Sequence, residues 1–175
     1  MDADNDHQLG CYTEHGVSGY GVAVKLSRNE AMNEAFLKQM AEEMMLSIAE
    51  KSMELGARCI GHIKSHIRTG AGTLKADTIG ASHGAYSSGR LTHPVKELFM
   101  AINSIVQGIP EDAVKAATLE GMHQVAEMRG LLVVKEKEHT YFDKFDFVTT
   151  TEDFVEELAQ QLKAEVPGDR ALEDG

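Results

Sequence analysis

The sequence predicts an α+β fold of the ferredoxin-like type, in which a mostly antiparallel sheet carries two packed helices on one face. Three observations support this prediction. Apolar residues alternate with other residues over 20–26, which is typical of a strand with one buried face. Apolar residues recur every three or four positions over 30–55 and 110–130, which indicates two helices. Strand-like segments at 57–68 and 131–137 each follow one of these helices.

The first helix is expected to run from Glu30 to about Leu55. Ser27 or Asn29 can accept hydrogen bonds from its first amide groups. Gly56 suits the C-terminal end, because glycine adopts the left-handed conformation that often follows a helix.

The strand at 57–68 has two chemically different faces. Thr69–Gly72 fits a hairpin turn into a third strand at 73–81, and the small, polar segment 82–89 is expected to be a mobile loop. Simple alternation places Cys59, Gly61, Ile63, Ser65 and Ile67 on one face of the 57–68 strand, and Ile60, His62, Lys64, His66 and Arg68 on the other.

Residues 94–107 fit either a helix or a strand by their periodicity alone. As a strand, every second residue from Leu98 to Val106 would line one face. Pro110 followed by Glu111 and Asp112 is a typical helix start, because proline fixes φ and acids interact favourably with the positive end of the helix dipole.

These segments define one α+β domain over 18–149. Residues 1–17 are polar and aperiodic, which indicates a flexible acidic arm. Residues 150–166 are expected to form an additional acidic C-terminal helix, followed by an acidic tail over 167–175.

Charge and composition exclude several function classes. The formal net charge is -11, and the acids are concentrated in 1–14 and 152–175, so binding to nucleic acid is not expected. No apolar run reaches about 18–20 residues, so no membrane partner is expected. The chain has 2 cysteines and begins without a basic and apolar leader, which favours a cytoplasmic location.

Histidine and cysteine supply the candidate metal ligands. His62 and His66 share a strand face, but residues four apart on a strand are about 13 Å apart, too far to ligate one ion by themselves. Cys11 and His15 form a Cys-x3-His pair, and thiolate with imidazole suits zinc or another divalent transition metal. The alternative is that all four are ordinary surface residues. Cys59 is expected to be a small buried residue.

A second candidate site lies in the 83–90 segment. His83, Tyr86 and Arg90 could bind an anion together with backbone N–H groups, although a solvated connection explains the same residues. The sequence contains no phosphate-binding loop, dinucleotide fingerprint, zinc-protease motif or hydrolase serine motif. No nucleotide cofactor is therefore expected.

Three short motifs resemble the C-terminal accessory domain of CobW-type metallochaperone GTPases. The resemblance covers about residues 19–137 and implies that 96–107 is a strand and that His62 and Lys64 are functional positions. The GTPase half of that family, with its phosphate loop and cysteine metal motif, has no counterpart here, so GTP hydrolysis is not carried over. The motifs are Leu55-Gly-Ala-Arg-Cys-Ile-Gly61-His62-Ile63-Lys64, Met100-Ala-Ile-Asn103-Ser-Ile-Val106 and Ile109-Pro110-Glu-Asp-Ala-Val114.

The sequence thus favours a non-enzymatic cytoplasmic accessory module that binds a metal ion or a partner protein. One alternative is a protein-interaction or homo-oligomerisation module without a ligand, which an open sheet face or an unpaired edge strand would allow. The other alternative is an enzyme with its site at 83–90.

Overall fold

The computed structural model describes residues 16–139, which belong to the compact unit Met1–Tyr141. The expected helix at 150–166, the tail at 167–175 and residues 1–15 of the expected arm lie outside the described residues. In chain order the elements are β1 (Val17–Met32), α1 (Glu34–Glu54), β2 (Cys59–Thr69), β3 (Gly72–Thr78), the 3-10 helix η1 (Ala81–His83), β4 (Ala85–Leu91), β5 (Val95–Gln107), α2 (Glu111–Met128) and β6 (Leu132–His139).

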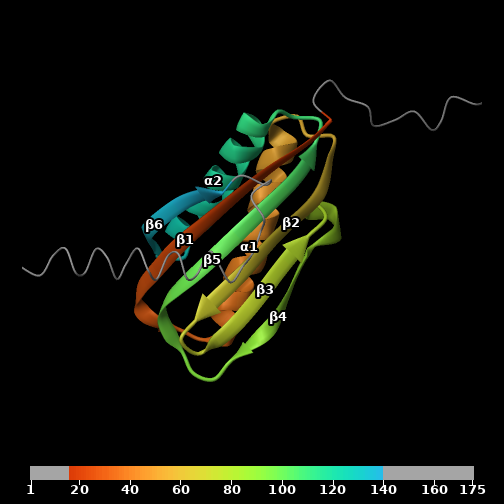
Figure 1. The fold of residues 1–175 in the computed structure, drawn as a ribbon. Helices are drawn as coiled ribbons and strands as arrows, with labels where there is room; N and C mark the ends of the chain where they lie inside the picture. Colours follow the sequence, from red (N-terminus) through yellow and green to blue (C-terminus); the bar gives the residue numbers. More distant parts are fainter. Residues whose placement is uncertain (1–15, 140–175) are drawn as a thin grey trace, which may run out of the picture. The chain divides into compact units, whose positions relative to one another are not determined.

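The six strands form one antiparallel sheet in the order β4-β3-β2-β5-β1-β6. Strands β1, β2, β5 and β6 with the two helices make interleaved βαβ units, which is the ferredoxin-like connectivity. The β3–β4 hairpin is inserted after β2 and extends the sheet on that side. Both helices lie on the same face of the sheet (Figure 1). The predicted α+β fold is confirmed, and residues 95–107 form a strand.

The core lies between the sheet and the two helices. Every second residue of β5 from Leu98 to Val106 is buried, as the strand alternative predicted. Helix α1 contributes several methionines, whose unbranched side chains fill irregular gaps. The largest fully buried side chains are Leu26, Met32, Leu37, Met40, Met44, Met45, Ile48, Ile63, Ile67, Leu74, Leu98 and Met100.

Helix α1 begins later than the sequence suggested. Strand β1 continues to Met32, and the cap is Asn33, whose side-chain oxygen accepts a 2.8 Å hydrogen bond from the Phe36 amide. The prediction of Ser27 or Asn29 as the cap was wrong, because Met32 is fully buried and the strand therefore extends past both candidates.

A β-bulge at Gly61 changes the faces of β2. Ile60 lies opposite Val106 whereas His62 lies opposite Ile105, so Gly61 is the extra residue. Ile60 is only 8% exposed and points into the core, whereas Cys59 is half-buried and belongs to the other face. The prediction that Ile60 shares a face with His62, and Cys59 the buried face, was therefore wrong.

The predicted loop at 82–89 is instead η1 followed by the edge strand β4. Its backbone pairs with β3, and it is also tied to α1. Ser87 Oγ donates to Glu42 Oε1 at 2.5 Å, and the Leu91 amide donates to Glu34 Oε2 at 2.9 Å. Edge strands tolerate small and polar side chains, so hydropathy gives little sign of them.

Candidate functional site

Most of the candidate site residues lie on the sheet face that points away from α1 and α2, which we call the open face. Directly opposite residues of antiparallel strands project to the same face, so the register identifies its members. They are Tyr86, Ser88 and Arg90 of β4, Thr73, Lys75 and Asp77 of β3, Cys59, His62, Lys64, His66 and Arg68 of β2, Glu97, Phe99, Ala101, Asn103, Ile105 and Gln107 of β5, Val17, Gly19, Gly21, Ala23, Lys25 and Ser27 of β1, and Leu132, Lys135 and Lys137 of β6.

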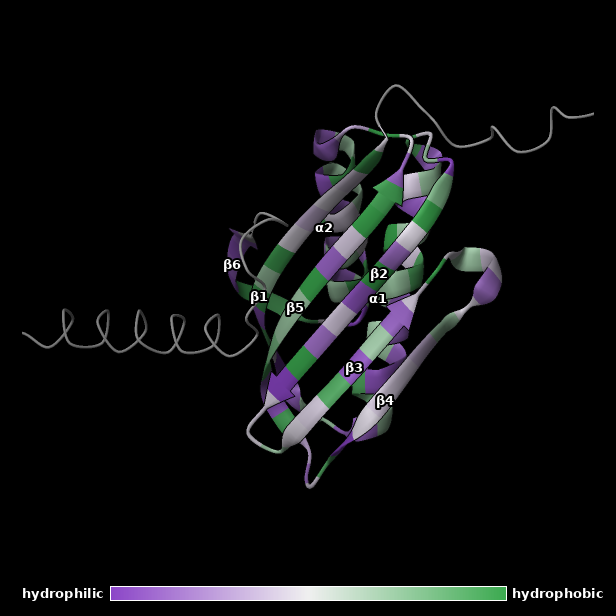
Figure 2. Cartoon of the chain, turned by 45° about the vertical axis from the view of Figure 1, so that its right-hand side comes forward, coloured by the Kyte–Doolittle hydropathy of each residue, from purple (hydrophilic) through white to green (hydrophobic). Residues whose placement is uncertain are grey.

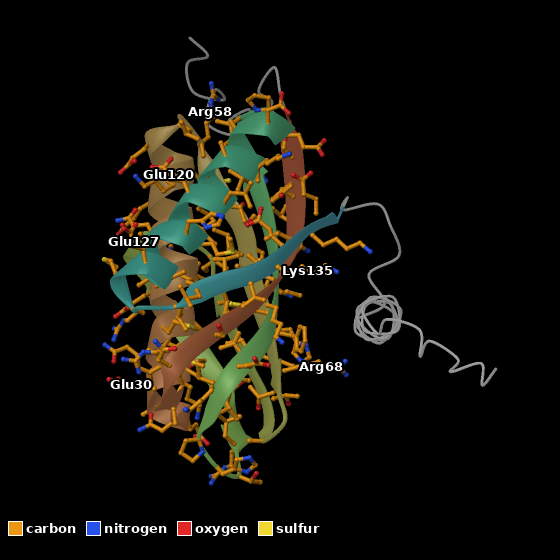
Figure 3. The ribbon with its side chains drawn as sticks, turned by 90° about the vertical axis from the view of Figure 1, so that its left-hand side faces the viewer. Glu30, Arg58, Arg68, Glu120, Glu127 and Lys135 are labelled. Atoms are coloured by element: carbon orange, nitrogen blue, oxygen red, sulfur yellow. The ribbon has the colours of Figure 1, made fainter. Side chains whose placement is uncertain are left out.

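Basic side chains dominate the open face, whereas the helices are rich in acids. Hydrophilic and hydrophobic residues alternate along β2 and β3, as expected for strands with one buried side (Figure 2). Arg68 and Lys135 lie on one side of the sheet, and Glu120 and Glu127 lie on the helix side (Figure 3). The basic residues of the open face are Lys25, Lys64, Arg68, Lys75, Arg90, Lys135 and Lys137, and its acids are Asp77 and Glu97.

Apart from Lys64, the basic residues fall into two rows that cross the strands. Because neighbouring strands are about 4.8 Å apart, the five steps from β4 to β6 span about 24 Å. On the central strands β5 and β1, the first row has two alanines, whereas the second has Phe99 and Lys25. In strand order the rows are Ser88, Lys75, His66, Ala101, Ala23 and Lys137, and Arg90, Thr73, Arg68, Phe99, Lys25 and Lys135.

His62 and His66 both lie on the open face, in different surroundings. Nε2 of His62 is 3.5 Å from Oδ2 of Asp77. His66 lies opposite Lys75 and on the same strand face as Arg68. Burial first, and then these two cations, lower the pKa of His66, because both disfavour the imidazolium form.

The described residues do not form a metal centre. Within residues 16–139, no three His, Cys, Asp or Glu side chains are grouped closely enough to hold a metal ion. Zinc takes three or four protein ligands, so His62 and His66 do not make a zinc site with their present neighbours. Cys11 and His15 lie outside the described residues.

Lys64 and Asn103, which belong to two of the family-like motifs, are directly opposite each other on β2 and β5. Lys64 is exposed, whereas Oδ1 of Asn103 is shielded from solvent and has no hydrogen-bond partner among the described residues. Both residues lie at the centre of the open face, where the exposed Lys64 is placed to contact a bound partner.

The 83–90 candidates do not converge on one site. His83 is exposed in η1, where its Nδ1 lies 3.1 Å from Oγ of Ser82. Tyr86 is 69% exposed on β4. Arg90 is four residues further along β4, which corresponds to about 13 Å. Tyr86 and Arg90 are therefore members of the open face, separate from His83.

Sequence reasoning missed the basic and aromatic residues that come from strands other than β2. These residues are Lys25, Lys75, Phe99, Lys135 and Lys137. Lys25, Lys75 and Phe99 each lie between two buried residues of their own strand, a signal that was available in the sequence. Their common position became visible only once the strand order and register were known.

Together the fold and this site define an α+β protein with a basic sheet face that no helix or strand of residues 16–139 covers. No family model and no curated protein matches the sequence. Among solved structures, a crystal structure of a Zn(II)-bound triple mutant of the YjiA GTPase is similar over 60% of this chain, with 14% identity and a TM-score of 0.29. The chain spans 29% of that structure.

Within residues 16–139, no helix is both long and apolar enough to cross a bilayer.

Proposed function

We propose that this chain is a non-enzymatic cytoplasmic binding module whose open face docks a negatively charged partner. The observation that carries the proposal is the separation of charge between the two sides of the sheet. Lys25, Lys64, Lys75 and Lys137 come from four different strands, so only the folded sheet gathers them. Complementary charge accelerates association and fixes the orientation of a partner.

A second copy of the chain is a poor partner for this face. A two-fold dimer sets the same surface against itself, so Lys64, Lys75 and Lys137 would meet their own counterparts. Like charges brought together across an interface cost free energy. A homo-oligomer would therefore use another surface, such as the edge strands β4 and β6.

The test uses the full chain and a fluorescein-labelled polyglutamate peptide, with binding followed by fluorescence anisotropy at low salt. Lys64→Gln/Lys75→Gln removes two charges from the open face, and Lys38→Gln/Lys51→Gln removes two from α1. We expect the first variant to bind about 3- to 10-fold more weakly and the second to bind like the parent. Absence of binding by the parent, or equal weakening in both variants, would reject the proposal.

Metal binding is a second candidate function. It is favoured by the bulge at Gly61, which sets Cys59 and His62 on one face, and by the Asp77 carboxylate 3.5 Å from His62 Nε2. Cys59, His62 and Asp77 are not grouped closely enough to hold a metal ion by themselves. Further ligands would therefore come from outside the described residues, where Cys11 and His15 lie in the sequence.

Competition with a chromophoric zinc chelator tests this second candidate on the full chain. We expect His62→Ala/His66→Ala to lose zinc, with His93→Ala as a matched exposed control that keeps it. Zinc affinity that is the same in the parent and in the double variant would remove these two histidines from any metal site.

A further inference from the structure

The open face carries features that distinguish between anionic partners. Phe99 lies on the central strand β5, directly between Arg68 of β2 and Lys25 of β1. Nζ of Lys25 is 5.7 Å from the centre of the Phe99 ring. Tyr86 adds a second, strongly exposed ring at the edge of the same face. Rings set among cations bind unpaired bases by stacking while the cations hold the backbone, whereas acidic side chains offer no planar ring to stack.

The dimensions of the face favour a single strand over a duplex. The major groove is about 12 Å wide and admits a helix or a two-stranded ribbon. A six-stranded sheet is about 24 Å across and cannot enter it. A single strand can instead lie on the sheet, with its backbone along the cations and its bases against the surface.

The overall acidity of the chain does not oppose this arrangement. The expectation that nucleic acid is not a partner rested on the net charge of -11, most of which comes from 1–14 and 152–175, outside the strands and helices of the sheet domain in the sequence. At physiological ionic strength the Debye length is about 8 Å, and packed layers are about 10 Å apart. A bound strand therefore responds mainly to the open face, where cations outnumber acids.

We infer that the open face binds single-stranded nucleic acid, with Lys64, Arg68, Lys75 and Lys137 contacting backbone phosphates and Phe99 stacking on a base. This inference rests on the proposed function and names the class of its partner.

The test exploits the absence of tryptophan from the sequence. In the full chain, Phe99→Trp places one fluorophore on the open face. Phe36→Trp is the matched control on α1, because the guanidinium carbons of Arg28 and Arg129 lie 4.7 and 5.7 Å from the Phe36 ring centre. Added fifteen-nucleotide dT or rU is expected to quench the fluorescence of Phe99→Trp and to leave that of Phe36→Trp unchanged.

Anisotropy with the same labelled oligonucleotides supplies the quantitative arm. We expect the logarithm of the binding constant to fall with the logarithm of salt concentration, with a slope about 0.7 smaller for each open-face lysine replaced by glutamine. Phe99→Leu keeps an apolar side chain and removes the ring, so it should bind about 5- to 100-fold more weakly.

The outcomes distinguish binding of single-stranded nucleic acid from the more general proposal that the open face binds a negatively charged partner. If polyglutamate binds the open face and the oligonucleotides do not, the partner is an acidic protein and the inference fails while the proposed function stands. If neither probe binds, both fail. If a duplex of equal length competes as well as the single strand, or quenching is the same at positions 99 and 36, the inference is overturned.

Discussion

Gly121 of α2 packs directly against the backbone of Ile48 of α1. A Cβ atom at position 121 would lie 2.8 Å from the Ile48 nitrogen and 2.9 Å from its Cα, closer than real Cβ contacts occur. The two helices therefore approach each other at a point where only glycine fits. This contact sets how closely the two helices pack together on their shared side of the sheet.

Gly121→Ala tests this close approach. Alanine normally stabilises a helix interior by about 1 kcal/mol relative to glycine, but here the added methyl meets backbone atoms that cannot rotate away. We expect the variant to be less stable by about 1–3 kcal/mol, measured by urea denaturation. Gln124→Ala, at an exposed position of the same helix, should stay within about 0.5 kcal/mol. A more stable Gly121→Ala protein would mean that the helices do not touch there.

The periodicity of apolar residues predicted much of this fold, because the side chains that face the core must be apolar. It located both helices and the strands that follow them, and it described the buried face of β5 once a strand was assumed. It placed Ile60 on the wrong face, since one inserted residue at Gly61 reverses the alternation. It also missed β4, whose backbone hydrogen bonds to β3 leave no hydropathy signal.

The candidate site was predictable only in part. His62, Lys64 and His66 are close in sequence, and alternation alone placed them on one face. Lys25 and Lys137 join them only through the strand order, because antiparallel pairing brings β1 and β6 alongside residues far away in the chain. The net charge of -11 gave no sign of the basic face, because most of it comes from the acids of 1–14 and 152–175.

Ser104 of β5 and Thr118 of α2 form a buried hydroxyl pair that joins a helix to the sheet. The Oγ1 atom of Thr118 is 2.9 Å from Oγ of Ser104 and 2.8 Å from the Val114 carbonyl oxygen. Thr118→Val should cost about 1–3 kcal/mol, because it leaves the Ser104 hydroxyl buried without this partner. Ser104→Ala should cost less, because Thr118 keeps its bond to Val114.

A double-mutant cycle measured by urea denaturation tests this pair. In Ser104→Ala/Thr118→Val no hydroxyl is left without its partner, so the double variant should lose less stability than the two single losses added together. If the stability lost by the double variant equals the sum of the losses of the two single variants, the hydroxyl groups do not interact.

The buried phenol of Tyr20 makes the free energy of unfolding depend on pH in the alkaline range. Burial, followed by the charges of Glu138 and Glu136, raises the pKa of the Tyr20 phenol above its ordinary value. Above about pH 10 the unfolded chain releases this proton while the folded chain keeps it, so the stability from this group is present below that pH and lost as pH rises further. Tyr20→Phe should show a flatter decline in urea denaturation between about pH 9 and 11. An identical decline in both proteins would contradict this environment.

His66 reports the cationic character of the open face. Because burial, Arg68 and Lys75 lower the pKa of His66, the folded chain binds this proton less readily than the unfolded chain, whose value is about 6.5. The stability contributed by neutral His66 is therefore present above about pH 6.5 and is lost as pH falls through the folded pKa.

The NMR titration of the imidazole, assigned with His66→Gln, should give a folded pKa below that of a model peptide. Lys75→Gln should raise the pKa of His66, because it removes a charge directly opposite the ring. Saturation with the dT oligonucleotide should also raise this pKa, because phosphates favour the imidazolium form. An unchanged titration in both experiments would show that neither Lys75 nor a bound phosphate acts on this histidine.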